Sequence, residues 1–338
     1  MNLMSGFASA LTIAFMYWSI ILILLKIVKT KKEYELKKNF AISGAALVGC
    51  LSFTFTDSFW FNAVEAEVYA MATLIMAVLF YLGLRWESDM HKPRGDKWLL
   101  LISFVIGLSF GVHFMGLLTI PAIFLIYYFK NSKEINAKYG LSLKSGFVIA
   151  NIIGLVILMG VFKLILPNTL KFFSVIELLF VNNFGLPFNS GTLAAFIILG
   201  FTFYYLIDFT IKKKLITANT IVLCFLFIFI GFSSWLILPI RANANVVVNE
   251  NNPSNARELL AYYNLEQYPK THLFYGPLFS DQYSGMDEDK NKRYKDDNPK
   301  YEKDLEKNKY VIVNDYKDAL QNYNSDHASI LPRMWSSE

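Results

Sequence analysis

Three carboxylates stand in one short segment between two apolar stretches of the sequence. Residues 53–69, which we call the acidic segment, read FTFTDSFWFNAVEAEVY and contain Asp57, Glu65 and Glu67 but no lysine or arginine. Carboxylates are unfavourable in hydrocarbon, so we expect this segment to lie at a membrane surface or to face a water-filled cavity. Such carboxylates can bind a divalent metal ion or an acceptor group of a substrate. We therefore predict that the segment forms one wall of an active site.

Helix geometry separates the roles of the two glutamates. If the segment is helical, Glu65 and Glu67 lie about 200° apart around the axis, so only one can face a given cavity. Asn62, Glu65 and Tyr69 would then share one helix face. Any bound metal ion would use Glu65 or Glu67. The structural alternative is that Asp57 caps the next helix while the glutamates favour its first turn through the helix dipole.

Two basic side chains are candidates for binding phosphate. His113 follows Gly107 and Gly111, whose GxxxG spacing most often marks close packing between helices. A histidine at the tip of a membrane hairpin can contact a phosphate, and it can equally be a hydrogen-bonded core residue. Arg241 ends the last apolar run, where an arginine either anchors the helix at the interface or binds a lipid phosphate. Asn243, two residues later, belongs to the same predicted substrate-binding set.

The composition indicates an integral membrane protein with a polar tail. Of the 338 residues, 54% are hydrophobic and 17% are charged, whereas soluble chains carry about 25% charged residues. Up to Ile240 the apolar residues come in runs of about 20, the length that crosses a bilayer. We predict an all-α, polytopic transmembrane domain over residues 1–240. We expect an extracytoplasmic soluble tail of mixed α/β or irregular structure over residues 241–338.

The apolar runs predict eight spans, two of which form a short helical hairpin. The hairpin divides one apolar run of 32 residues, 98–129, which Gly107, Gly111, Gly116 and Pro121 interrupt. We expect its turn near residues 111–113, and one long tilted helix is the alternative. The eight predicted spans cover residues 3–25, 40–56, 67–84, 98–111, 114–129, 145–166, 192–211 and 218–239.

Lysine and arginine are sorted between alternate loops. Residues 57–66 hold none and residues 167–190 hold one. Four other segments hold 6, 4, 4 and 3 of them, respectively at residues 26–38, 85–97, 130–144 and 212–214. By the positive-inside rule these four face the cytoplasm, which places the acidic segment and the tail outside. We therefore predict an integral membrane protein whose active face and tail lie on the outer side. Charge sorted by loop is no signal for nucleic-acid binding.

The remaining segments predict local structure. Residues 167–190 predict an interfacial amphipathic helix followed by a turn rich in glycine and proline. In the tail we expect a helix over 256–263, a mobile loop over 281–309 and a strand over 310–313. The apolar run that begins at residue 3 lacks the basic start of a signal peptide, so we interpret it as a span.

Five motifs resemble a bacterial family of uncharacterised polytopic membrane proteins. That family is similar to GT-C glycosyltransferases of the protein O-mannosyltransferase type. The resemblance covers nearly the whole chain, and WFNAVEAEVY within the first motif is its most specific part. The motifs are SFWFNAVEAEVY at 58–69, GLSFGVHFMGLLTIP at 107–121, GLPFNSG at 185–191, IRANAN at 240–245 and LPRMWS at 331–336.

The resemblance implies transfer of a hexose, mannose by analogy, from a polyprenyl-phosphate donor. The acceptor would be a serine or threonine hydroxyl of an exported protein at the outer membrane face. Glu65 and Glu67 would line the catalytic cavity, His113 would lie near the donor phosphate, and Arg241 would lie at the cavity mouth. The rest of the predicted substrate-binding set is Asp57, Asn62, Tyr69 and Asn243.

The sequence departs from the family pattern at its first outer loop. That loop normally carries an Asp-Glu element with the expected general base and a His-Pro-Pro-Gly stretch, and neither motif occurs here. We therefore expect a chain that begins at the family's second span and stops early. It would be a fragment, a sequence with an incorrectly assigned start codon, or a split subunit with a complementing N-terminal segment. The alternative function is a non-catalytic polyprenyl-phosphate-binding or transporter-like protein, bound to membrane lipid without sugar transfer.

Overall fold

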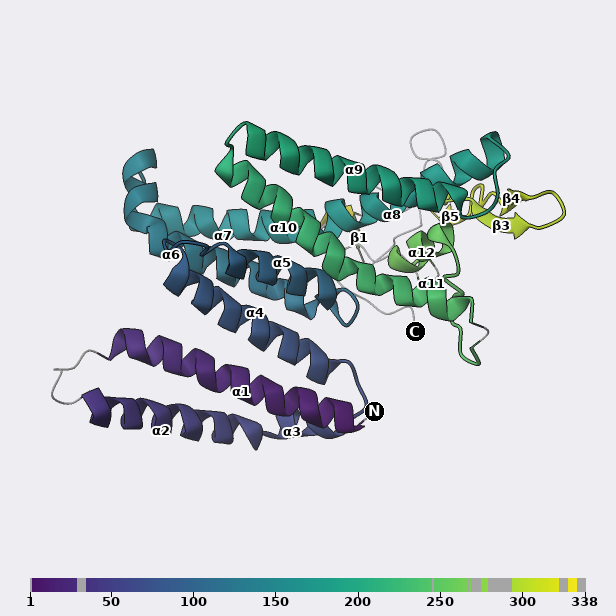
Figure 1. The fold of residues 1–338 in the computed structure, drawn as a ribbon. Helices are drawn as coiled ribbons and strands as arrows, with labels where there is room; N and C mark the ends of the chain where they lie inside the picture. The colour runs from purple at the N-terminus through teal and green to yellow at the C-terminus, as the bar shows by residue number, and fades with distance from the viewer. Residues whose placement is uncertain are drawn as a thin grey trace. The chain divides into compact units, whose positions relative to one another are not determined.

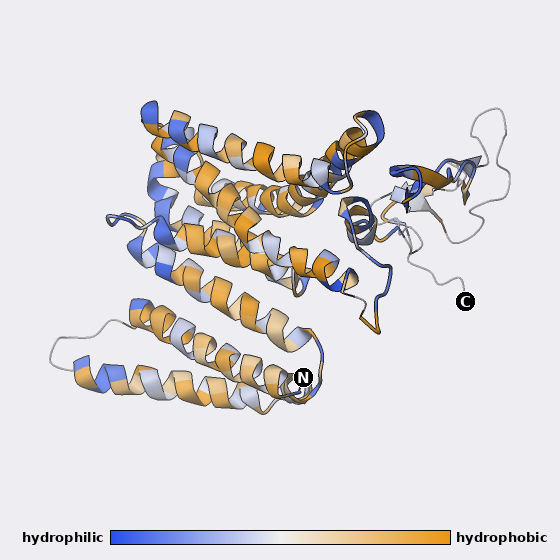
Figure 2. Ribbon diagram, turned by 45° about the vertical axis from the view of Figure 1, so that its right-hand side comes forward, coloured by the Kyte–Doolittle hydropathy of each residue, from blue (hydrophilic) through white to orange (hydrophobic). Residues whose placement is uncertain are grey.

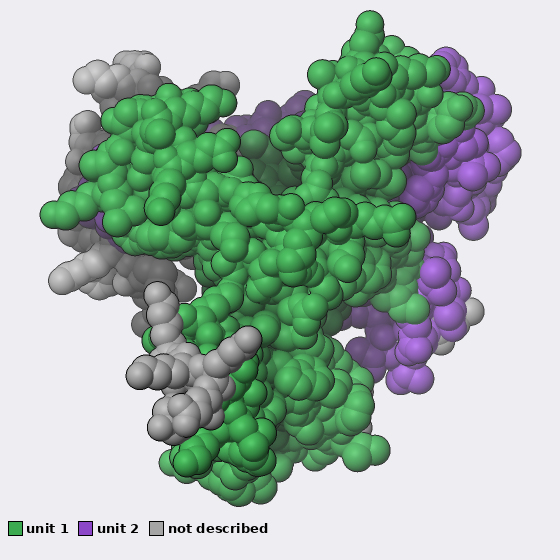
Figure 3. All heavy atoms as spheres, turned by 60° about the vertical axis from the view of Figure 1, so that its left-hand side comes forward, with its two compact units in different colours: residues 1–166, 199–237 green, residues 167–198, 238–338 purple. Residues whose placement is uncertain are grey.

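The computed structural model is mostly helical and divides into two compact units (Figure 1). It describes residues 2–28, 35–244, 246–266, 268, 275–278, 294–321 and 328–332. Unit 1 comprises residues Met1–Leu166 and Leu199–Ile237, and unit 2 comprises Pro167–Ile198 and Leu238–Glu338 (Figure 3). Each unit is described by itself.

Unit 1 is a bundle of apolar helices. α1 packs on α4, α4 on α5, α5 on α10, and α6 on α7. The last part of α9, from residue 199, also belongs to this unit. Its elements are α1 (Asn2–Ile27), α2 (Glu35–Thr54), α3 (Asp57–Val64), α4 (Tyr69–Asp89), α5 (Lys97–Ser109), η2 (Phe114–Leu118), α6 (Thr119–Tyr139), α7 (Leu143–Met159), η3 (Gly160–Ile165), α9 (Ser190–Lys212), α10 (Ile216–Phe232) and η5 (Ser233–Leu236).

Six helical segments in the described part of the chain are long and apolar enough to cross a membrane. The pair α2 and α3 adds a seventh if its 68° bend is counted within one span. The predicted number of eight is not confirmed, because α5 has only 13 residues. The predicted break is confirmed: α5 ends at Ser109 and η2 begins at Phe114, so a single long helix over 98–129 is wrong.

The basic segments of unit 1 gather at one end of its helices. Figure 1 shows the end of α1, the start of α2, the end of α4 and the α9–α10 connection at this end. Figure 2 shows hydrophilic residues there and hydrophobic residues along the helices between the ends. The acidic segment and the turn after α5 lie at the opposite end of the unit. This arrangement agrees with the sorting of lysine and arginine between alternate loops.

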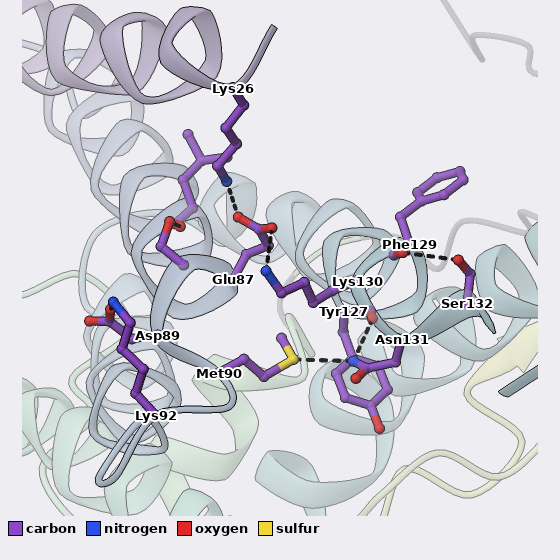
Figure 4. A network of polar contacts seen from close by, with 12 residues as sticks. Lys26, Glu87, Asp89, Met90, Lys92, Tyr127, Phe129, Lys130, Asn131 and Ser132 are labelled. Atoms are coloured by element: carbon purple, nitrogen blue, oxygen red, sulfur yellow. Dashed lines mark hydrogen bonds and ion pairs between the residues drawn. The ribbon is translucent and has the colours of Figure 1, made fainter. Parts of the chain in front are cut away.

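A polar network fixes three helices at the basic end (Figure 4). The carboxylate of Glu87 on α4 forms an ion pair with Lys26 of α1 and another with Lys130 of α6, the latter at 3.1 Å. The side-chain amide of Asn131 donates to the sulfur of Met90 at 3.1 Å. These contacts hold α1, α4 and α6 at a common level, so their opposite ends are also held relative to one another.

One long helical segment replaces two predicted elements. The chain is helical from Leu143 to Asn183, over 41 residues, through α7, η3, α8 (Leu166–Leu178) and η4 (Leu179–Asn183). The prediction that a span ends at residue 166 before a separate helix is therefore wrong. Pro167 lacks an N–H and its ring clashes with the preceding turn. The wider π-helical turns of η3 just before it accommodate that ring without ending the helix. The predicted glycine and proline turn follows, with Gly185 at φ 65°.

Unit 2 combines α8 from residue 167, the whole of η4 and the first part of α9 with the C-terminal tail. Its described residues also form α11 (Ile237–Ala242, from residue 238), α12 (Ala256–Tyr263) and three two-stranded antiparallel sheets. The sheets pair β1 (Tyr275–Pro277) with β6 (Ala328–Ile330), β2 (Tyr294–Lys295) with β5 (Leu320–Gln321), and β3 (Lys300–Asp304) with β4 (Lys309–Asn314).

The tail confirms two local predictions. The helix predicted over 256–263 has these bounds, and the side chain of Asn255 caps it by accepting from the N–H groups of Arg257 and Glu258 at 3.0 and 3.1 Å. The strand predicted over 310–313 lies within β4. Within the loop predicted to be mobile over 281–309, residues 300–304 form β3, which pairs with β4, and residues 281–293 lie outside the described residues. The predicted mobility stays a prediction.

Candidate functional site

The acidic segment is a bent connection rather than one helix. α2 ends at Thr54, α3 runs from Asp57 to Val64 after the 68° bend, and residues 65–68 are not helical. Glu65 has an extended backbone with ψ 149°. The predicted helix face shared by Asn62, Glu65 and Tyr69 is therefore wrong. Asp57 is the first residue of α3 and Thr56 holds the cap position, so the prediction that Asp57 caps the helix is also wrong.

The three carboxylates of the segment are accessible. Asp57 and Glu67 are exposed and Glu65 is half-buried. Within the described ranges, no hydrogen bond or ion pair reaches any of these carboxylates, since the structure shows only a backbone bond from the N–H of Glu65 to Phe61. Phe59 of α3 is 8% exposed and its ring lies 4.7 Å from that of Phe53. Apolar packing thus holds the segment while its carboxylates stay available to a ligand.

His113 lies beside the start of α4 and presents a hydrogen-bond donor. Its ring centroid is 5.6 Å from that of Tyr69, the residue that follows the non-helical connection. The Nδ1 atom of His113 accepts from the backbone N–H of Met115 at 3.1 Å and so caps η2. An imidazole nitrogen that accepts carries no proton, so the proton of the neutral ring is on Nε2. The free Nε2–H can donate to an anionic oxygen.

Close helix packing fixes the turn that carries His113. A Cβ on Gly107 would clash with the backbone of α10 near Ile228, and one on Gly231 would clash with the backbone of α5. The predicted close packing at Gly107 is therefore confirmed. Trp235 adds a hydrogen bond from Nε1 to the carbonyl of Phe110 at 2.6 Å. The turn is consequently held from α10 and η5, which favours a fixed position for the imidazole.

Arg241 and Asn243 belong to unit 2, whereas the acidic segment and His113 belong to unit 1. Both side chains are exposed. The amide nitrogen of Asn243 donates to the carbonyls of Pro239 and Ser254 at 2.7 and 2.8 Å, which fixes the start of the tail. Their predicted contacts with substrate stay predictions.

No group of three or more histidine, cysteine, aspartate or glutamate residues that could hold a metal ion occurs among the residues described. Glu65 and Glu67 alone offer fewer ligands than a stable divalent site uses. We therefore assign no step to a metal ion. The predicted use of Glu65 or Glu67 as a metal ligand stays a prediction.

A cavity of about 510 Å³ lies inside unit 1, between α4, α5, α6, α7, η3 and α10. Its walls are nearly all apolar, and Ser103, Thr220 and Cys224 supply its few polar side chains. This cavity suits an apolar group and carries no carboxylate, histidine or lysine for acid–base chemistry.

Two charged residues in the long helical segment were missed as site candidates. Lys163 lies in η3 next to Phe162, whose ring contacts that of Phe114 in η2 at 5.0 Å. Glu177 in α8 is 1% exposed, and its carboxylate accepts four hydrogen bonds. The signal available in the sequence was a single charge within a long apolar run. Lys163 fell in the span predicted over 145–166, and Glu177 fell in the helix over 167–190 that we predicted to be interfacial.

Comparison with known proteins gives two family matches. Residues 269–338 match a family of unknown function, DUF8416. No curated protein and no solved structure matches the chain. Residues 1–136 match the protein O-mannosyl-transferase TMEM260 N-terminal domain, a range that contains α1 to α5, most of α6, the acidic segment and His113.

Proposed function

We propose that this chain is a membrane glycosyltransferase, or part of one, that moves a hexose from a polyprenyl-phosphate donor to a protein hydroxyl. The observation that carries the proposal is the match of residues 1–136 to a protein O-mannosyl-transferase domain, because that range holds the unpaired carboxylates. Mannose is the proposed sugar, and the acceptor is a serine or threonine of an exported protein. We place the acidic end of unit 1 at the periplasmic face of a bacterial inner membrane.

The proposed reaction forms one bond to the sugar and breaks another. The acceptor hydroxyl oxygen bonds to the anomeric carbon, the bond from that carbon to the phosphate oxygen breaks, and the phosphate leaves with the electron pair. The hydroxyl proton must pass to a base as this happens. Glu65 and Glu67 are the carboxylates of the matched range that can accept a hydrogen bond from the hydroxyl and orient it, with Asp57 and Asn62 as further contacts.

His113 is suited to the leaving phosphate. Its Nε2–H donor is fixed by the Nδ1 bond to Met115 and by the packed turn, so it needs little reorganisation when negative charge develops. Tyr69, whose ring lies next to that of His113, supplies a hydroxyl group as a second hydrogen-bond donor at the same end of unit 1. Phosphate binding by Arg241, which belongs to unit 2, stays a proposal of its own.

The test is a transfer assay with the full chain in lipid nanodiscs. The donor is a polyprenyl-phosphate mannose carrying a radiolabelled sugar, and the acceptor is a peptide rich in serine and threonine. The proposal predicts labelled peptide from the wild type and at least about 100-fold less from His113→Phe, since a lost donor to the developing charge has effects of that size. Donor binding by the wild type without any labelled product would favour the non-catalytic lipid-binding alternative and overturn the proposal.

A further inference from the structure

Lys163 is a single charged residue within a long apolar stretch of the sequence. Between Lys144 and Lys171 it is the only charged residue of the chain. A rise of about 1.5 Å per residue puts it roughly 29 Å along the helix from Lys144. That distance matches the thickness of the hydrocarbon layer, about 30 Å. Because Lys144 lies at the basic end of unit 1, Lys163 reaches the opposite membrane surface, where the acidic segment lies.

Two contacts fix the position of Lys163 along the helix axes relative to the turn that holds His113. At Gly154 of α7, a Cβ would lie 2.9 Å from the Cα of Pro121 in α6, so the two helices touch there. Further toward the acidic end, Phe162 of η3 meets Phe114 of η2, with ring centroids 5.0 Å apart. His113 caps η2 at that point. Lys163 therefore lies beside the element whose first turn His113 closes.

The ammonium group of Lys163 is directed to this contact. Its Nζ lies 4.8 Å from the centroid of the Phe162 ring, and the side chain is exposed. No acidic residue pairs with Lys163 in the portion of the chain that the structure describes. An unpaired ammonium at an apolar surface gains most from an anion that arrives with a lipid.

We propose that Lys163 is a second phosphate-binding residue that, together with His113, holds the phosphate of a lipid-linked donor at the acidic end of unit 1. This inference rests on the proposed function for the identity of the donor. The ammonium supplies a full positive charge and three donors, while His113 supplies one oriented N–H. The ring of Phe162 contacts the ammonium through a cation–π interaction, which helps to position it.

Binding can be measured apart from transfer. The full chain in phosphatidylcholine nanodiscs is titrated with farnesyl phosphate, with farnesol and with inorganic phosphate. The variants are Lys163→Gln, Lys163→Arg and, as matched control, Lys171→Gln, which alters an exposed lysine of the same helical segment. Thermal unfolding of each variant shows whether the substitution has disturbed the fold.

We expect Lys163→Gln to weaken farnesyl phosphate binding about tenfold, the usual effect of one lost hydrogen bond to a charged group. Lys163→Arg should restore most of the affinity, Lys171→Gln should leave it unchanged, and farnesol binding should not respond to any variant. A residue that only anchors the helix at the interface would alter thermal unfolding and leave the preference for the phosphate over farnesol unchanged.

The inference is overturned if Lys163→Gln binds farnesyl phosphate like the wild type, or loses farnesol binding to the same degree. Inorganic phosphate bound as tightly as farnesyl phosphate would overturn the assignment to a lipid donor. If Lys163→Gln has no effect while His113→Phe abolishes transfer, the inference fails and the proposed function stands. If wild-type transfer is absent but phosphate binding depends on Lys163, the proposed function fails and the phosphate site stands.

Discussion

Two regions of this molecule place carboxylates in opposite environments, one buried and hydrogen-bonded and the other accessible and without hydrogen-bond donors among the described residues. In unit 2, Glu177 is 1% exposed and accepts from the N–H groups of Asn189 and Thr192 at 2.6 and 2.8 Å, and from the hydroxyls of Thr192 and Tyr310 at 3.0 and 3.2 Å. We call these four residues the Glu177 cluster. In unit 1, the carboxylates of the acidic segment accept no hydrogen bond from the described residues.

The difference follows from the energetics of a buried charge. A carboxylate removed from water is stable only when donors replace the lost hydration, and the Glu177 cluster supplies them. A carboxylate left at the surface needs no such partners and remains free to bind a substrate. The comparison assigns a structural role to Glu177 and agrees with the functional role that we propose for Glu65 and Glu67.

The Glu177 cluster also joins the tail to the turn after η4. Asn182 donates to the carbonyl of Tyr310 and accepts from its N–H, both at 2.8 Å, so its side chain pairs with β4 as a neighbouring strand would. The ring of Phe188 packs edge-on against Tyr310 at 5.1 Å. Gly191 has no side chain because a Cβ there would clash with the backbone at Glu177. The part of the tail that matches DUF8416 is thus fixed to residues 177–192.

The largest loss of stability is expected for Glu177→Gln. The amide cannot accept from all four donors, and one of its own N–H groups would face another donor. We expect the free energy of unfolding of unit 2 to fall by about 3 kcal/mol. Faster amide hydrogen exchange in β4 would report it. The matched control is Asp208→Asn in α9, whose partly exposed ion pair with Lys212 contributes little, and equal exchange in the two variants would contradict a structural role for Glu177.

Asn182→Ala should have the next largest effect. It removes both hydrogen bonds to the backbone of Tyr310 and leaves a partly buried N–H and carbonyl without their partners. We expect a loss of about 2 kcal/mol, with the faster exchange confined to the β3–β4 hairpin. Asn298→Ala, which changes an exposed asparagine of the tail, is the control. Unchanged exchange at Tyr310 would show that the side-chain pairing is not needed for docking of the hairpin.

Alkaline pH should weaken the cluster through Tyr310. Burial, and then the charge of Glu177, raise the pKa of the Tyr310 hydroxyl above its ordinary value of about 10. The folded state therefore holds this proton more tightly than the unfolded state, so its contribution to stability is complete below pH 10 and is lost as the pH rises through the raised pKa. Burial also raises the pKa of Tyr263, to about 12, in the same direction.

The difference between wild type and Tyr310→Phe isolates the contribution of Tyr310. At pH 8 the variant should lose about 1 kcal/mol, the usual worth of one hydrogen bond. Above pH 10 the gap between the two proteins should close, as followed by hydrogen exchange or chemical denaturation. A gap that stays constant from pH 8 to pH 11 would show that the phenol does not titrate with folding.

The smallest effects on stability are expected in the acidic segment. Asp57→Asn, Glu65→Gln and Glu67→Gln remove charges that have no partner among the described residues, so each should change the unfolding free energy by less than about 0.5 kcal/mol. Thermal unfolding in nanodiscs measures this. A loss as large as that of Glu177→Gln would place these carboxylates in the structure rather than in the site.

Local patterns predicted the local features well. The helix predicted over 256–263 is α12, and the Asn255 side chain satisfies its first N–H groups. Glycines between Gly107 and Gly116 marked the turn that carries His113. The match of residues 1–136 agrees with the resemblance first given by the motifs around Trp60 and His113.

Features that depend on distant contacts could not be predicted. Tyr310 reaches Glu177 across 133 positions of sequence, so no spacing rule connects them. Pro167 predicted the end of a span, and only the π-helical turns of η3 show how the helix continues through it. The end of α3 at Val64 and the extended backbone of Glu65 removed Glu65 from the helix face that its spacing with Asn62 and Tyr69 predicted.

The most direct test of the functional role of the acidic segment is the rate of mannose transfer to peptide by Glu65→Gln and Glu67→Gln, measured with the wild type in the same nanodiscs. We predict that at least one of the two loses about 100-fold or more in rate while its thermal unfolding stays at the wild-type value. Wild-type rates in both variants would contradict the assignment of these carboxylates to the reaction.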